Sequence, residues 1–132
     1  MLSQEIILTT IQNIVSDVLA IYLFGSTNTI YETSESDVDI AILTHRKITF
    51  DAQLHLVNQL IDALHKDKID LIDLRQVSTV LKFQIIFYGK RIYCANAYLC
   101  DSFEMYTFSD YVRLNEARRN ILRDIQERGS VL

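Results

Sequence analysis

The chain of 132 residues contains no proline and only three glycines. These two residue types mark most turns and linkers, so their scarcity argues against a flexible junction between separate domains. Internal repeats and low-complexity tracts are also missing from the sequence. The length fits one domain that is large enough to bury a hydrophobic core. We therefore expect a single, tightly connected α/β unit over residues 1–132.

Other absences exclude whole classes of protein. The apolar runs are too short and too interrupted by charge to span a bilayer, which argues against a membrane protein. The N-terminus lacks the basic start and the small-residue cleavage site of an export signal, so we expect a cytoplasmic protein. The two cysteines, Cys94 and Cys100, are then expected to stay reduced. Neither the cysteines nor the histidines have the spacing of a zinc site.

Clustered positive charge is scarce as well. The net charge of −4 argues against tight nonspecific binding to nucleic acid, which depends on lysine and arginine. Arginines gather only near the C-terminus, interleaved with acidic residues, and this spacing is typical of a solvated helix face with i,i+4 pairs. They are Arg113, Arg118, Arg119, Arg123 and Arg128. The sequence also contains neither a P-loop nor a GxGxxG dinucleotide motif.

The most informative feature that is present is Gly25-Ser26, followed after ten residues by Asp37-Val38-Asp39. Apolar runs of strand type lie before and after this motif. In an extended chain Asp37 and Asp39 point to the same side, and Val38 points to the other. Two carboxylates at this spacing can share Mg2+ when phosphates and water supply the remaining ligands.

The Gly-Ser pair complements these acids. Glycine lets the backbone approach an anion closely, and backbone N–H groups together with the Ser26 hydroxyl can hold the terminal phosphates of a nucleotide. Two metal ions would then activate an incoming hydroxyl and stabilise the departing pyrophosphate. The motif therefore predicts nucleotidyl transfer.

The hydrophobic periodicity predicts alternating helices and strands. Helices are expected over residues 3–17, 50–64 with Thr49 as N-cap, 77–88 ending at Gly89, and 97–128, with a break near Ser109 as an alternative to one continuous helix. Strands are expected over residues 21–24, 38–43, 68–74 and 91–94. The first two strands are joined without a crossover helix, which indicates a small mixed β-sheet. We expect an α/β (α+β) fold with helices packed on one face of this sheet and the other face open.

Gly25-Ser26, Asp37-x-Asp39 and the strand Ile69-Asp70-Leu71-Ile72 resemble the DNA-polymerase-β-like nucleotidyltransferases, specifically the minimal nucleotidyltransferases. Weaker matches at residues 81–85, 89–93, 103–104 and 110–111 resemble the antitoxins of HEPN/MNT toxin–antitoxin pairs, known as type VII. The resemblance implies the nucleotidyltransferase fold and an Mg2+-dependent protein adenylyltransferase, with two ions and ATP as substrate. AMP would be transferred to a tyrosine of a HEPN-family toxin, a HepT-like ribonuclease, and residues 97–128 would form a helical extension that docks this partner.

Carried over residue by residue, the resemblance implies that Gly25 and Ser26 bind the nucleotide and that Asp37 and Asp39 bind the metals. Strand alternation leaves both Asp70 and Asp73 open as the third carboxylate. Related nucleotidyltransferases place this acid between two apolar residues, which favours Asp70.

The turn after Ser26 departs from the family pattern, in which an arginine and a glycine usually follow. Here the residues are Thr27-Asn28-Thr29-Ile30, so the arginine whose positive charge would neutralise the triphosphate is missing. Candidate replacements are Arg46, Lys47, Arg75 and Lys82. This altered turn leaves open a rival function, an antitoxin that only binds and blocks its toxin. A second rival, independent of the turn, is a nucleotidyltransferase with another acceptor, such as a small-molecule antibiotic or an RNA end. Tyr106 and Tyr111 are candidates for contact with a partner.

Overall fold

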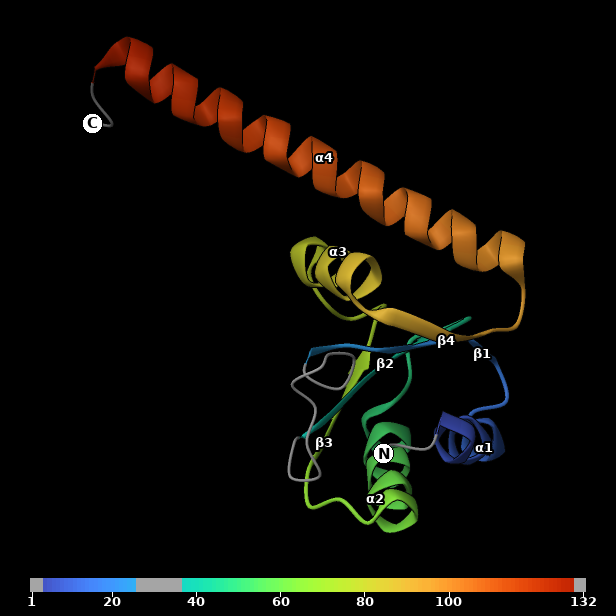
Figure 1. The fold of residues 1–132 in the computed structure, drawn as a ribbon. Coiled ribbons are helices and arrows are strands. Elements are labelled where there is room, and N and C mark those ends of the chain that lie inside the picture. The colour runs from blue at the N-terminus through green and yellow to red at the C-terminus, as the bar shows by residue number, and fades with distance from the viewer. Residues whose placement is uncertain (1–3, 26–36, 130–132) are drawn as a thin grey trace.

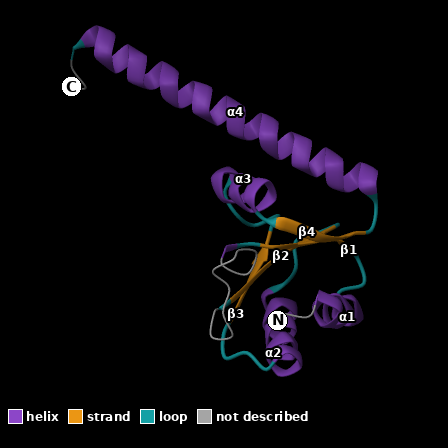
Figure 2. Cartoon of the chain, viewed as in Figure 1, coloured by secondary structure: helices purple, strands orange, loops and turns teal. Residues whose placement is uncertain are grey.

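The structure, a computed structural model, describes residues 4–25 and 37–129. A four-stranded sheet lies between two pairs of helices (Figures 1 and 2). The elements are α1 (Gln4–Ile14), β1 (Val18–Leu23), β2 (Val38–Thr44), α2 (Phe50–Leu64), β3 (Ile69–Asp73), α3 (Thr79–Tyr88), β4 (Lys90–Cys94) and α4 (Ala97–Arg128).

The sheet is mixed, as its strand pairing shows. The strand order is β3-β2-β1-β4. β1 pairs with β2 and with β4 in the antiparallel sense, whereas β2 and β3 are parallel and are joined through α2. This arrangement confirms the predicted fold class.

Helices pack on both faces of the sheet, whereas the sequence analysis placed them on one. α1 and α2 cover the first face, where Ile21, Ile40 and Ile42 lie in their core. On the second face, α3 and the start of α4 pack over a core that contains Tyr22 and Leu43. Every residue of β1 is buried. An uninterrupted apolar strand of this kind is the sequence signal of burial on both faces.

The helix boundaries agree well with the expected ranges, but the buried side of α2 differs. Thr49 caps this helix by accepting a hydrogen bond from the Ala52 amide. The apolar residues that recur at steps of four and three, which predict the buried side, are Phe50, Leu54, Val57, Ile61 and Leu64. The fully buried residues are instead Leu56 and Leu60, and Phe50 is 78% exposed. Several apolar positions alternate around α2, so spacing alone could not select the face that meets α1.

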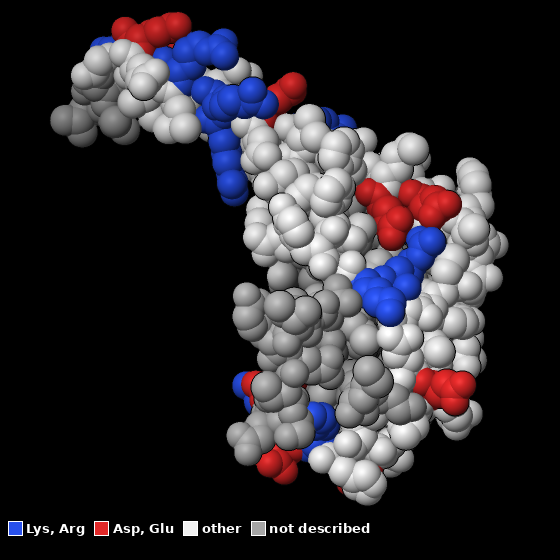
Figure 3. Space-filling view, in the orientation of Figure 1, with Lys and Arg blue, Asp and Glu red and all other residues white. Residues whose placement is uncertain are grey.

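The long helix α4 runs without interruption past Ser109, so the alternative of a break there is wrong. Its buried residues, Cys100 and Thr107, both lie in its first third. The rest of the helix extends beyond α3 and away from the sheet (Figure 1). Arginine side chains gather on its outer part (Figure 3), and ion pairs such as Arg128–Asp124 support the expected solvated face. None of the helices that the structure describes is long and apolar enough to cross a membrane.

A polar cluster joins α4 to the sheet at β1 and β4. The hydroxyl of Tyr22, which is 1% exposed, donates a hydrogen bond of 2.8 Å to Glu104 Oε1. Arg91 of β4 lies 3.4 Å from the same carboxylate and 3.2 Å from Asp101. Burial, the hydrogen bond and the charge of Glu104 raise the pKa of Tyr22, so its hydroxyl remains a donor at every physiological pH. The start of α4 is therefore fixed to the sheet.

Candidate active site

Two of the three predicted acids lie directly opposite each other on neighbouring strands. The parallel register of β2 and β3 pairs Asp39 with Asp70, and their carboxyl groups share a hydrogen bond. The residues that flank each acid in its strand belong to the core beneath α1 and α2, so both acids point to the opposite face. Figure 1 shows α3 and α4 over the β1 and β4 side of that face, away from β3.

Asp37 comes directly before β2, near the same group. Its Oδ2 atom lies 3.6 Å from the ammonium of Lys68, and the Asp37 side chain is 51% exposed. Burial raises the pKa of Asp39 to about 6, and the hydrogen bond and charge of Asp70 and the charge of Asp37 act in the same direction. The charge of Lys68 opposes this effect. A cluster of carboxylates that repel one another in this way is stabilised by a bound cation.

Asp73, the reserve candidate for the third acid, has a structural role. It is 3% exposed and accepts hydrogen bonds of 2.9 Å from the backbone amides of Ile48 and Arg75, and of 2.7 Å from the Gln76 side-chain amide. Its carboxylate thus fastens the end of β3 to two neighbouring loops. Asp70 is exposed beside Asp39, which favours Asp70 as the third acid.

Gly25 lies against Asp39 in a conformation that favours glycine. Its φ angle is +60°, and a Cβ atom added there would lie 2.3 Å from Asp39 Oδ2. The amide of Phe24 also donates to the Asp39 carbonyl oxygen over 3.2 Å. The turn that follows β1 is therefore brought directly onto the acid cluster. Ser26 and residues 27–30 lie outside the described part of the chain.

None of the four basic residues considered as replacements for the motif arginine is seen beside the acids. Arg75 donates to the Thr44 carbonyl oxygen, and its guanidinium lies 5.7 Å from the centre of the Phe103 ring. The Lys82 ammonium lies 5.9 Å from the same ring. The other two, residues 46 and 47, follow the end of β2 opposite to Asp39.

Lys68 is a basic side chain that the structure places at the acid cluster, and the sequence analysis did not select it. It directly precedes β3, and the parallel pairing of Val38 with Ile69 brings it close to Asp37. A sequence signal for this contact did exist, because residues that precede two adjacent parallel strands lie at the same edge of the sheet.

The donor chemistry of this cluster fits Mg2+. Carboxylate oxygens are the ligands that this ion prefers, with water and substrate phosphates completing its shell. The carboxyl groups of Asp39 and Asp70 lie within hydrogen-bonding reach of each other, so a single cation could be held by both. Within residues 4–25 and 37–129, however, no three His, Cys, Asp or Glu side chains already form a metal-binding arrangement.

An open groove of about 480 Å³ adjoins Gly25 on the side of α3. The residues that line it are Phe24, Gly25, Leu81, Gln84, Ile85, Tyr88 and Gly89. The groove thus begins at the turn that touches Asp39 and continues along the helix. Its size is suitable for a small organic ligand.

The site consists of the Gly25 turn and the paired acids Asp39 and Asp70 on a mixed sheet. This arrangement agrees with the result of comparing the sequence with known protein families. The polymerase β nucleotidyltransferase family model matches residues 4–98. The chain belongs to this nucleotidyltransferase family. The resemblance inferred from the motif is therefore confirmed, as is the prediction that the chain is a nucleotidyltransferase enzyme.

Known proteins similar to this nucleotidyltransferase include protein adenylyltransferase MntA of Shewanella oneidensis. The two are 36% identical over 105 residues, which cover 80% of this chain and 74% of the relative. A crystal structure of a toxin–antitoxin with AMP-PNP contains a chain that is 32% identical, with a TM-score of 0.82 and coverage of 95% of this chain and 99% of that one.

A further structure contains the tri-AMPylated HEPN toxin of S. oneidensis in complex with its MNT antitoxin. The matched chain is 32% identical, with a TM-score of 0.71, and the alignment covers 91% of this nucleotidyltransferase and 92% of that chain.

Proposed function

We propose that this nucleotidyltransferase is the antitoxin of a type VII toxin–antitoxin pair and that it acts in the cytoplasm. In this proposal it transfers AMP from ATP to a tyrosine of a HEPN ribonuclease toxin and thereby inactivates the toxin. The observation that carries the proposal is the pairing of Asp39 with Asp70 beside the Gly25 turn. The similarity to MntA over most of both chains supports the choice of acceptor.

Each site residue has a role in this reaction. Asp37, Asp39 and Asp70 would hold Mg2+, which when bound neutralises the triphosphate and lowers the pKa of a bound hydroxyl. Gly25 lets the backbone approach the phosphates, and Ser26, assigned from the motif alone, would add its hydroxyl. The tyrosine oxygen forms a bond to the α-phosphorus while the bond to pyrophosphate breaks. Because the phenol has a pKa of about 10, a carboxylate near the metals is needed to accept its proton.

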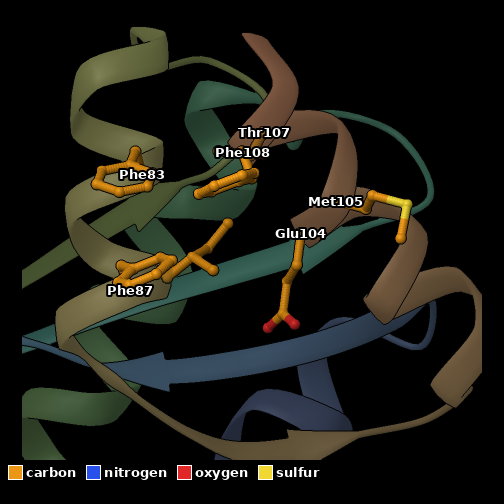
Figure 4. Close-up of a pocket in the computed structure, with 7 residues that line it drawn as sticks. Phe83, Phe87, Glu104, Met105, Thr107 and Phe108 are labelled. Carbon is orange, nitrogen blue, oxygen red and sulfur yellow. The ribbon is translucent and has the colours of Figure 1, made fainter. Parts of the chain in front are cut away.

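The partner is proposed to dock on α4 and its contact with α3. A groove of about 470 Å³ lies between these helices, and Figure 4 shows Phe83 and Phe87 on its α3 side and Glu104, Met105 and Phe108 on its α4 side. Met105 is 71% exposed and Phe108 48%. Exposed apolar side chains of this kind mark interaction surfaces.

The two tyrosines singled out in the sequence lie differently on this helix. Tyr106 is 72% exposed and is available to a partner. Tyr111 stacks on Phe83 with ring centroids 3.8 Å apart. It therefore contributes to the contact between the helices, and Tyr106 is the better candidate for partner contact.

A direct test uses the product of the adjacent gene as partner. The two proteins are co-purified and incubated with ATP and Mg2+, and intact masses are measured. We expect the mass of the partner to rise by one or more AMP units on tyrosine, and expect no rise with Asp39→Ala. No AMP on the partner with the wild-type protein would contradict the proposal.

The binding-only antitoxin is the second candidate, favoured by the missing motif arginine at residues 27–30. It predicts that Asp37→Ala and Asp39→Ala variants still neutralise the toxin in cells. The adenylyltransferase predicts that both variants fail although they bind the toxin as tightly as the wild type does.

A further inference from the structure

The groove beside Gly25 joins the acid cluster to the exposed side of α3. Gly25 forms one end of it, where an added Cβ atom would touch the Asp39 carboxylate. From there the groove follows α3 past Tyr88 to Gln84 and Leu81. A nucleotide whose α-phosphate lies at the acids therefore has an adjoining hollow for its remaining part.

The dimensions of the groove suit a nucleoside. Gln84 and Tyr88 are four residues apart, so they lie on the same face of the helix about 6 Å apart along its axis. This separation is close to the width of a purine. The groove volume of about 480 Å³ leaves room for a ribose between the base and Gly25.

The chemistry of the walls is also suitable for a purine. The apolar side is formed by Phe24, Leu81 and Ile85, and the aromatic ring of Tyr88 is 75% exposed. Aromatic rings at such positions offer a face on which any base can stack. Gln84 is exposed at the edge of the groove and is the side-chain amide among its lining residues.

An amide side chain distinguishes adenine from guanine. Its N–H group and its oxygen lie side by side, and they match the neighbouring acceptor and donor on an edge of adenine. Guanine presents two neighbouring acceptors on one edge and two neighbouring donors on another. A side-chain amide that offers one donor and one acceptor can therefore pair with only one group of either edge. A carboxylate, in contrast, can accept from the two neighbouring donors of guanine.

We propose that this groove is the nucleoside subsite of the enzyme, in which Tyr88 stacks on the base and Gln84 selects adenine. The inference rests on the proposed function, since it assumes that the substrate is a nucleoside triphosphate bound at Asp39. It assigns the preference for ATP to α3, outside the Gly-Ser and Asp-x-Asp motif. Both residues are positioned by a helix whose Ile85 is buried in the core, so the subsite is part of the rigid fold.

The test measures dissociation constants of AMP-PNP and GMP-PNP for the full-length protein in the presence of Mg2+, by calorimetry. We expect wild type to prefer AMP-PNP. Gln84→Glu should shift the ratio of the two affinities toward GMP-PNP by about 10- to 100-fold, the range for one bidentate contact. The matched control is Gln59→Glu, which adds the same charge at an exposed position of α2 and should leave the ratio unchanged.

The stacking role is tested separately. Tyr88→Ala should weaken both analogues about 10-fold or more, whereas Tyr88→Phe, which keeps the ring, should bind like wild type. Tyr98→Ala, which removes a tyrosine of similar exposure from α4, serves as control.

The outcomes separate the two proposals. If wild type prefers AMP-PNP but Gln84→Glu keeps the wild-type ratio and Tyr88→Ala keeps the wild-type affinity, the subsite is refuted and the proposed function stands. Equal affinity of wild type for both analogues refutes the role of Gln84. If wild type binds neither analogue, the proposed function itself fails.

Discussion

The two aspartates of β3 make a sharp prediction, because they lie three residues apart in one strand and differ completely in environment. Asp73 is 3% exposed and accepts three hydrogen bonds, whereas Asp70 is exposed beside Asp39. We expect Asp73→Ala to destabilise the fold. We expect Asp70→Ala to abolish AMP transfer while leaving the stability almost unchanged.

The magnitude for Asp73→Ala follows from its partners. The substitution leaves the amides of Ile48 and Arg75 without their acceptor, at about 1 kcal/mol each for partly solvated groups. Losing the contact with the Gln76 side chain costs roughly another 1 kcal/mol. The free energy of unfolding should therefore fall by about 3 kcal/mol, which corresponds to a Tm lower by roughly 10 °C for a chain of this size.

For Asp70→Ala the expected change in the free energy of unfolding is within about 0.5 kcal/mol, as for other exposed sites. Removing this carboxylate also relieves its repulsion of Asp39. The assay is urea unfolding followed by circular dichroism in EDTA, with AMP transfer measured by intact mass. The assignment of Asp70 would be refuted if Asp73→Ala left the protein stable but inactive, or if Asp70→Ala retained activity.

Three further predictions concern other residues of the site and of the α4 attachment. Gly25→Ala should abolish AMP transfer, because the added Cβ atom would displace the Asp39 carboxylate. The control is Gly129→Ala, at a position with a similar φ angle but open space around it. This variant should lose only about 1 kcal/mol of stability and stay active. Asp39→Asn should stabilise the metal-free protein at pH 7 but not at pH 4, as measured by urea unfolding. The pKa of Asp39 is about 6 in the folded protein, which is above its value in the unfolded chain. The wild type therefore loses stability as the pH rises from the unfolded pKa to the folded pKa, and the asparagine variant does not. An equal effect at both pH values would contradict the raised pKa. Tyr22→Phe should cost about 1.5–3 kcal/mol of unfolding free energy, since it removes a buried hydrogen bond to a carboxylate, and Glu104→Gln should make this cost smaller in a double-mutant cycle.

Much of this architecture could be predicted from local patterns. The Thr49 cap, the strand after residue 68 and the helix that ends at Gly89 depend on neighbouring residues alone, and their boundaries were correct within a few residues. The side of each helix that meets the core was harder to predict. Phe50 is exposed because the packing of α2 against α1 selects Leu56 and Leu60, and that contact is between segments far apart in the chain.

The candidate site shows the same division. The motif specified Asp37 and Asp39, and alternation limited the third acid to Asp70 or Asp73. The choice between these two depends on the loops that reach Asp73, which local pattern does not contain. Lys68 was missed for a related reason, since its contact with Asp37 depends on the register of β2 and β3.

The length of α4 has a consequence for the lifetime of the chain. A helix of 32 residues is about 48 Å long, and a segment without tertiary support is only marginally stable in water. We therefore expect its outer half, which carries the exposed Ile121 and Leu122, to open often and to exchange its amide hydrogens quickly. Proteases cut such open segments first. A copy left alone would be trimmed from its C-terminal end, and a copy held in a complex would survive.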